Sequence, residues 1–141
     1  MKKIVLLAAM AICAIACEKE DQVVQQAEYQ TTSVPYRTRT AVAVPGADLK
    51  VDLKDVSDSR CPKNVVCIQA GDAKLLFDVS EGSNEAEVVV NFKGDAKTDS
   101  QTFVLGAQKY LLKVSSVLPY PETSQSPRLD DYKVQLAIEK L

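Results

Sequence analysis

Residues 85–92 read Glu-Ala-Glu-Val-Val-Val-Asn-Phe, so that Ala86, Val88, Val90 and Phe92 share one parity and mostly polar residues occupy the other. A period of two is typical of a β-strand that packs one face against a core. The same alternation recurs along the chain in the ranges 41–44, 49–53, 65–79, 102–105, 110–114 and 132–138. We therefore expect about seven strands, of which the longest run, 65–79, is one long strand or a bent pair.

Turn-forming residues separate these ranges, among them Pro45-Gly46, Gly82 and Gly106. Glycine and proline favour the tight turns that join antiparallel strands. After residue 16, no window of ten or more residues repeats with the 3.6-residue period of a helix. The sequence therefore predicts an all-β fold, an antiparallel β-sandwich that is immunoglobulin-like or related, in a single domain spanning residues 38–141.

The composition excludes several kinds of function. The 141 residues contain no His and no Trp, and the formal net charge is −2. Without His, neither a Ser-His-Asp or Cys-His catalytic group nor a His-ligated zinc site can form. An acidic chain also lacks the basic face that nucleic acids require. We therefore expect no cofactor, no metal site and no nucleic-acid partner.

The first 16 residues have the order of a secretory signal peptide, with Lys2 and Lys3 followed by an apolar stretch from Ile4 to Ala16. This stretch is shorter than the roughly 20 residues that a membrane-spanning helix needs. Cys17 follows the apolar stretch directly and precedes the charged residues 18–21. An ordinary signal peptide with a chance cysteine at its end is the alternative to a lipoprotein signal.

Residues 14–17, Ala-Ile-Ala-Cys, resemble a bacterial lipobox. The resemblance implies cleavage after Ala16 and attachment of acyl chains to Cys17. Two or more acyl chains hold a protein stably in a bilayer, since each buried CH₂ contributes about 0.8 kcal/mol. We expect a protein of the bacterial cell envelope whose partner is the membrane itself, through Cys17, and which lies at the outer membrane. The charged residues 18–21 also resemble a surface-export signal, so the surface and the periplasmic face both stay open.

Residues 17–37 connect the lipidated cysteine to the domain. They are rich in Gln and Thr and contain few aliphatic residues, of which Val23 and Val24 form the one pair. Polar segments of this kind stay solvated and extended. The sequence therefore predicts a flexible spacer that holds the domain away from the bilayer.

Two cysteines are left for the domain, since Cys13 belongs to the signal and Cys17 to the lipid. Cys61 and Cys67 enclose five residues, and exported proteins meet an oxidising compartment. We expect a structural disulfide, which would be worth about 2.4 kcal/mol for a loop of this length. A redox-active pair and a two-thiolate metal site are the alternatives, although the spacing is not Cys-x-x-Cys. Beside the loop, Arg60 is positioned to bind Asp58 or Asp55 through charge-assisted hydrogen bonds.

The same region carries a recognisable motif. Residues 58–62 read Asp-Ser-Arg-Cys-Pro and residues 67–71 read Cys-Ile-Gln-Ala-Gly. This pattern resembles a family of small secreted bacterial lipoproteins with β-sandwich modules, in which Trp is usual where this chain has Gln69. The resemblance covers roughly residues 41–141 and implies the sandwich fold. It implies no activity and no catalytic residue.

The candidate binding loop is Pro119-Tyr120-Pro121, which opens a long connection rich in Ser, Thr and Pro. Long loops on rigid sandwiches often carry recognition, and Tyr is a favoured contact residue. The alternative is that the Tyr120 ring only packs over the end of the sandwich. We expect a binding or interaction module with a protein or glycan partner.

Three other function classes are weaker. A purely structural envelope component has no sequence feature against it. A small enzyme would need paired carboxylates, and neither Asp130 with Asp131 nor Glu85 with Glu87 suits that role, because the first pair would diverge and the second faces solvent. The acidic stretches 95–99 and 130–131 could supply oxygen ligands for calcium, but neither matches an EF-hand loop. We expect no enzyme.

Overall fold

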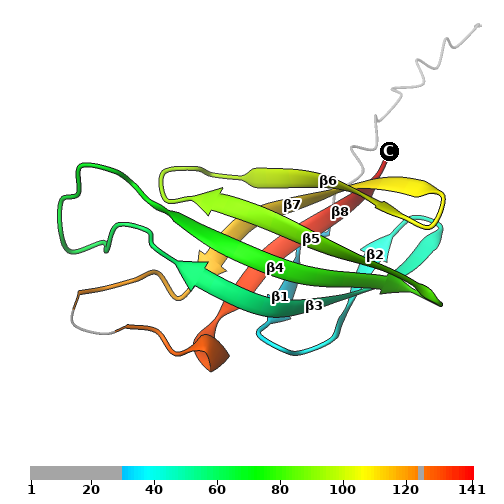
Figure 1. Cartoon of the computed structure of the whole chain (residues 1–141), viewed down its shortest axis with the longest axis horizontal. Helices are drawn as coiled ribbons and strands as arrows, with labels where there is room; N and C mark the ends of the chain where they lie inside the picture. The colour runs from blue at the N-terminus through cyan, green and yellow to red at the C-terminus, as the bar shows by residue number, and fades with distance from the viewer. Residues whose placement is uncertain (1–29, 124–125) are drawn as a thin grey trace, which may run out of the picture.

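The computed structural model describes residues 30–123 and 126–141, and these form an all-β domain (Figure 1). Eight strands and one 3-10 turn follow each other along the chain: β1 (Thr32–Pro35), β2 (Thr40–Val44), β3 (Ala47–Asp58), β4 (Asp72–Glu81), β5 (Asn84–Lys93), β6 (Asp99–Leu105), β7 (Gln108–Leu118), η1 (Leu129–Asp131) and β8 (Lys133–Lys140). No helix in these residues is long and apolar enough to cross a membrane.

Two antiparallel sheets of four strands pack face to face. One sheet has the order β1-β8-β7-β6 and the other the order β2-β3-β4-β5. The inward residues of the period-two pattern form the core between them, and the largest fully buried ones include Leu49, Leu53, Leu75, Phe77, Tyr110, Leu112 and Leu136. The predicted antiparallel β-sandwich is therefore confirmed, with eight strands in place of about seven.

The additional strand is β1, which lies in the segment that the sequence assigns to the spacer. Its Val34 is buried and pairs with Val134 of β8. Four residues with a single inward aliphatic side chain carry too little alternation to be recognised as a strand. The folded domain thus begins before residue 38, and residues 1–29, with Cys17 and the predicted signal peptide, lie outside the described part of the chain.

The predicted strand range 65–79 is wrong in its first part. β4 begins at Asp72, and Val65 and Cys67 lie in a loop where both are exposed. Their parity with Leu75 and Phe77 is a coincidence of spacing, because Gly71 has a φ of 68° and interrupts the extended backbone between them.

The sandwich has two distinct ends. The C-termini of β3 and β7 and the N-termini of β4 and β8 lie at one end, which the Cys61–Cys67 loop and the 119–131 connection extend (Figure 1). Gln30 and the C-terminus of β8 lie at the other end, with the short turns β2–β3, β4–β5 and β6–β7. Register shifts in β3 after Leu53 and in β7 after Val114 bend both strands on their way to the first end.

Candidate functional site

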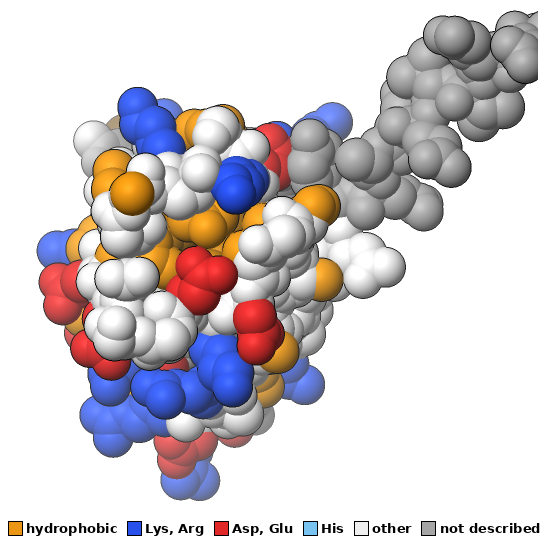
Figure 2. All heavy atoms as spheres, turned by 90° about the vertical axis from the view of Figure 1, so that its right-hand side faces the viewer, with side chains coloured by type: hydrophobic (Ala, Val, Ile, Leu, Met, Phe, Trp, Pro, Cys, Tyr) orange, Lys and Arg blue, Asp and Glu red, His pale blue; other side chains and the backbone are white. Residues whose placement is uncertain are grey.

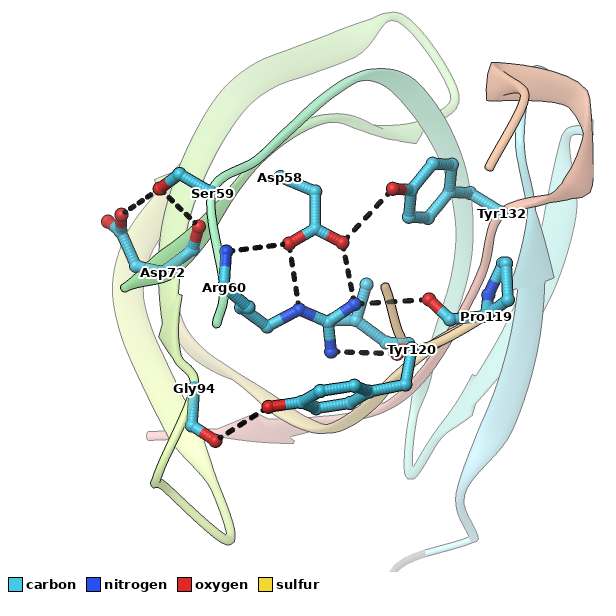
Figure 3. A network of polar contacts seen from close by, with 9 residues as sticks. Asp58, Ser59, Arg60, Asp72, Gly94, Pro119, Tyr120 and Tyr132 are labelled. Carbon is cyan, nitrogen blue, oxygen red and sulfur yellow. Dashed lines mark hydrogen bonds and ion pairs between the residues drawn. The ribbon is translucent and has the colours of Figure 1, made fainter. Parts of the chain in front are cut away.

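Arg60 is the one charged residue among those described that is buried as a whole, with 3% of its surface exposed. It lies just after β3, and its guanidinium forms a two-pronged ion pair with Asp58 (Figure 3). Nε donates to Asp58 Oδ1 at 2.9 Å and Nη2 donates to Oδ2 at 2.7 Å. A guanidinium and a carboxylate in this arrangement form the strongest hydrogen bonds available to neutral-pH side chains.

The same guanidinium reaches the other sheet. Nη1 donates to the carbonyl oxygen of Val117 at 3.0 Å, and Nη2 donates to that of Pro119 at 3.2 Å. Val117 lies near the end of β7, where the strand still pairs with β8 but has passed the end of its pairing with β6, and Pro119 directly follows the strand. A buried charge is tolerated only when its hydrogen bonds are satisfied. Arg60 therefore joins the ends of β3 and β7, one from each sheet.

Tyr132, directly before β8, completes this network. Its hydroxyl donates to Asp58 Oδ2 at 3.0 Å. Burial, together with the negative charge of Asp58 and this hydrogen bond, raises the pKa of Tyr132 to about 12. Burial by itself would raise the pKa of Asp58, but the hydrogen bonds and charge of Arg60, with the bond from Tyr132, outweigh it and lower that pKa. Asp58 is thus an ionised acceptor and Tyr132 a neutral donor at ordinary pH.

Tyr120 covers the network from the outside. Its ring centroid lies 4.6 Å from the Arg60 guanidinium carbon, a cation–π arrangement, and its hydroxyl donates to the Gly94 carbonyl oxygen at 3.4 Å (Figure 3). Of the two interpretations of Pro119-Tyr120-Pro121, the geometry corresponds to a ring that packs over the end of the sandwich. Binding of a partner by this loop stays a prediction.

The cysteine loop is anchored at its base and closed by the predicted disulfide. The Cα atoms of Cys61 and Cys67 are 5.9 Å apart across the bond. The Ser59 N–H donates to the Asp72 carbonyl at 2.8 Å, and that of Cys61 to the Ala70 carbonyl at 2.7 Å. A Cβ at Gly71 would lie 2.0 Å from the Ser59 carbonyl oxygen, so the close approach of the two segments requires glycine there.

The 119–131 connection holds the loop from its other side. The Asn64 side-chain amide donates to Thr123 Oγ1 at 2.6 Å, and Asn64 Oδ1 accepts from the Thr123 N–H at 3.1 Å. The Lys63 N–H donates to the Pro121 carbonyl at 3.1 Å, and the Lys63 ammonium pairs with Glu122. The loop is thus held by a covalent bond and by its contacts with residues 121–123 of the neighbouring connection.

The tip of this surface is apolar. Val66 and Ile68 are fully exposed, and Val65 is 43% exposed. Other large aliphatic residues are exposed on the strands, among them Val89 on β5, which pairs with Leu76 of β4, and Val104 on β6, which pairs with Lys109 of β7. Three β-branched residues on one short, fixed loop are unusual on the surface of a small domain.

A mixed hollow of about 690 Å³ lies between Lys63 of the cysteine loop and the 119–131 connection. The candidate loop residues Pro119 and Tyr120 line it together with Lys63, Glu122 and Lys133. Asp131 also borders it, whereas Asp130 is exposed and pairs with Arg128. Glu85 and Glu87 lie on the solvent side of β5, as their parity predicted. No group of three or more His, Cys, Asp or Glu side chains within the described ranges is arranged to hold a metal ion.

The sequence identified part of this site. The tie between Arg60 and Asp58 is confirmed, whereas Asp55 lies apart and accepts a hydrogen bond from the Val56 N–H at 2.9 Å. The contacts of Arg60 with Val117 and Pro119, and the exposed tip at Val66 and Ile68, have no local signal. The contacts of Arg60 depend on residues almost sixty positions away. The tip lies in a range that the alternation of Val65 and Cys67 with β4 assigns to a strand.

Comparison with known proteins finds no matching family model, no curated relative and no similar solved structure.

Proposed function

We propose that this protein is a lipid-anchored interaction module of the bacterial cell envelope, and that it contacts a partner protein through the tip of the cysteine loop, residues 65–68. The observation that carries the proposal is the full exposure of Val66 and Ile68 on a loop fixed by a disulfide and by the Asn64–Thr123 hydrogen bonds.

Rigidity supports this proposal. Folding alone gives no reason to hold exposed aliphatic side chains in place, because a mobile loop would expose them at the same cost in solvation. A fixed loop favours the binding of a partner, because the backbone of the tip is already ordered and the entropy cost of ordering it is not added on binding. Exposed apolar residues held on a rigid scaffold are typical of contact surfaces.

The chemistry of the tip favours a protein over a glycan. Valine and isoleucine side chains offer no hydrogen bonds to sugar hydroxyls, whereas they fit a shallow apolar depression on a protein. The hollow that Lys63 shares with Tyr120 and Glu122 offers polar groups on the same surface, and protein interfaces have such groups around an apolar centre.

The position of the tip supports attachment through Cys17. The described chain begins at Gln30, which lies beside Lys140 and Leu141 at the end of the sandwich opposite the cysteine loop (Figure 1). A lipid anchor upstream of Gln30 would leave the cysteine loop directed away from the membrane. We place the protein at the outer membrane, on its surface or its periplasmic face.

Site-specific photo-crosslinking in the native host tests the contact surface. A photoreactive amino acid is introduced at Val66, and in a second strain at Val104, an exposed valine on β6 near the opposite end. We expect the Val66 probe to give a discrete crosslinked product that the Val104 probe does not give. The Ile68→Ser substitution should reduce that product severalfold, because it removes one of the two fully exposed aliphatic side chains of the tip.

Equal crosslinking from both positions would contradict the proposal, as would a product from Val66 that survives Ile68→Ser unchanged. Unchanged thermal stability of each variant is the control for folding. The substituted side chains are exposed, so changes of this kind should alter stability by no more than about 0.5 kcal/mol.

A further inference from the structure

Two further surfaces of the described domain lie away from the cysteine loop and the Arg60 network. One is a hollow of about 1030 Å³ between β2 and the end of β8, on the side of the sandwich that Figure 2 shows, where hydrophobic side chains lie between polar and charged ones. Small and aliphatic side chains line most of it, and these do not distinguish one partner from another. The other surface is the outer edge of β5, whose residues do.

β5 is the outer strand of its sheet, and its ten residues make a long edge. No strand in the described part of the chain pairs with this edge. β6 of the other sheet forms its ladder with β7 and touches β5 at its two ends. Asn84 lies close to Gly106 at one end. At the other, the Lys93 N–H donates to Asp99 Oδ2 at 2.8 Å. A long edge with unpaired backbone groups is a template for pairing with another chain.

The ladder with β4 decides which backbone groups of β5 are free. Glu81 and Asn84 are paired on either side of a short turn, so they bond each other, and the bonds to β4 then recur at every second residue of β5. The residues between direct their N–H and C=O groups to the free edge, and these are Glu85, Glu87, Val89 and Asn91. The bond from Lys93 to Asp99 agrees with this alternation, because Lys93 has the same parity.

The side chains of this parity have an order that complements itself when it is reversed. Along the outer face of β5 they are Glu85, Glu87, Val89, Asn91 and Lys93. None of the ion pairs among the described residues involves Glu85, Glu87 or Lys93. Val89 is 36% exposed and pairs across the sheet with Leu76, which is partly buried. The edge is thus acidic at one end, basic at the other and apolar at its centre.

We propose that two copies of this chain pair antiparallel along β5, about a two-fold axis at Val89. In this register Val89 lies opposite Val89 of the second copy, and Glu85 lies opposite Lys93 of the second copy. Opposite charges at directly opposed positions stabilise antiparallel strands, and the two valines with Leu76 behind each of them form an apolar row across both copies. A register shifted by two residues no longer places the valines opposite each other. The two-fold axis closes the contact, so that pairing stops at two copies.

A cysteine at the two-fold axis tests the contact. Val89→Cys places thiols on directly opposed residues, whose Cα atoms in an antiparallel pair are about 5.5 Å apart, a separation that suits a disulfide. In the full chain, as its host processes it and under mild oxidation, we expect a covalent dimer linked at position 89 as the major product. Ala43→Cys is the matched control, because Ala43 is exposed on β2, the other outer strand of the same sheet. This variant should stay monomeric.

Charge reversal tests the register. Adding Glu85→Lys to Val89→Cys sets a lysine opposite Lys93 at both ends of the ladder, and it should reduce the covalent dimer severalfold. Adding Lys93→Glu as well restores opposite charges and should restore the dimer. Both positions are exposed, so the melting temperatures of these variants should stay close to that of the natural protein.

Every outcome bears on the proposal. A charge-dependent dimer at Val89, together with a monomer at Ala43, supports it. It is overturned by equal dimer yields at both positions, by a Val89 dimer that does not respond to charge reversal, and by the absence of a dimer. A crosslink from Val89 to a different protein also overturns it, because the edge then receives a strand of that protein. Val66 and Ile68 lie outside the paired strands, so failure here leaves the proposed function untouched.

Discussion

At the scale of single residues, the packing of the sandwich end that carries the cysteine loop depends on the charge of Arg60. Arg60 satisfies Asp58, Val117 and Pro119 at once, and Tyr120 covers it. A buried ion-pair network of this kind contributes little net stability compared with well-packed apolar residues in the same place. It matters greatly when one partner is removed, because a charge is then left buried and uncompensated.

Arg60→Ala should therefore destabilise the domain by about 3–5 kcal/mol, since Asp58 loses its counter-ion and two carbonyls lose their donors. The measurement is urea unfolding followed by circular dichroism. Arg128→Ala is the control, because its guanidinium is exposed and lies 4.0 Å from Asp130, and it should change stability by less than about 0.5 kcal/mol. A loss for Arg60→Ala no larger than that of the control would show that the network is dispensable.

The pKa of Tyr132 predicts how stability depends on pH. Folding raises this pKa from 10.0 to about 12, so the folded state holds the phenolic proton more tightly than the unfolded state. The resulting stability is complete below pH 10 and is lost as pH rises toward 12. Tyr132→Phe lacks this group, so its stability deficit against the natural protein should shrink across that window. Melting temperatures at several alkaline pH values measure this, and a constant deficit would refute the assignment.

At the scale of elements, the sequence predicted the strands that carry a repeated alternation of apolar and polar residues. It missed the short strand β1 and the contacts between residues that are far apart in the chain. Seven of the eight strands carry enough alternating residues to be recognised. β1 does not, because Val34 is its one buried aliphatic residue. The predicted strand 65–79 begins too early, because Val65 and Cys67 share the parity of the β4 residues by chance. Arg60 could be paired with Asp58, two residues away, but not with carbonyls of β7, because their proximity exists only after the sheets have packed.

The cysteine loop is the element with the clearest energetic prediction. Replacing Cys61 and Cys67 together by Ser should lower stability by about 2–3 kcal/mol, the loop-closure entropy for six positions of separation, without changing the fold. Urea unfolding of the double variant gives the difference, and mass spectrometry of the natural protein should detect no free thiol at either position. Free thiols in protein from an oxidising compartment, with no loss on substitution, would instead indicate a redox pair.

At the scale of the whole molecule, the two ends of the sandwich have different tasks in the proposed arrangement. The end with Gln30 and Leu141 receives the chain from the membrane, and the end with Arg60 displays Val66 and Ile68. The long strands β3, β4 and β7 run between them and keep the two ends apart at a fixed distance. This separation has a function only if the chain is attached upstream of Gln30.

Attachment through Cys17 is therefore the prediction on which the orientation depends. Cys17→Ser should prevent fatty-acid labelling and cleavage after Ala16, because the acylated sulfur is what the resemblance to a lipobox requires. Metabolic labelling with palmitate measures this directly. The variant domain should still form the Cys61–Cys67 bond, since the residues that surround it lie within the described domain. Labelling that persists in the variant would place the anchor elsewhere, and the tip at Val66 would then have no defined direction relative to the membrane.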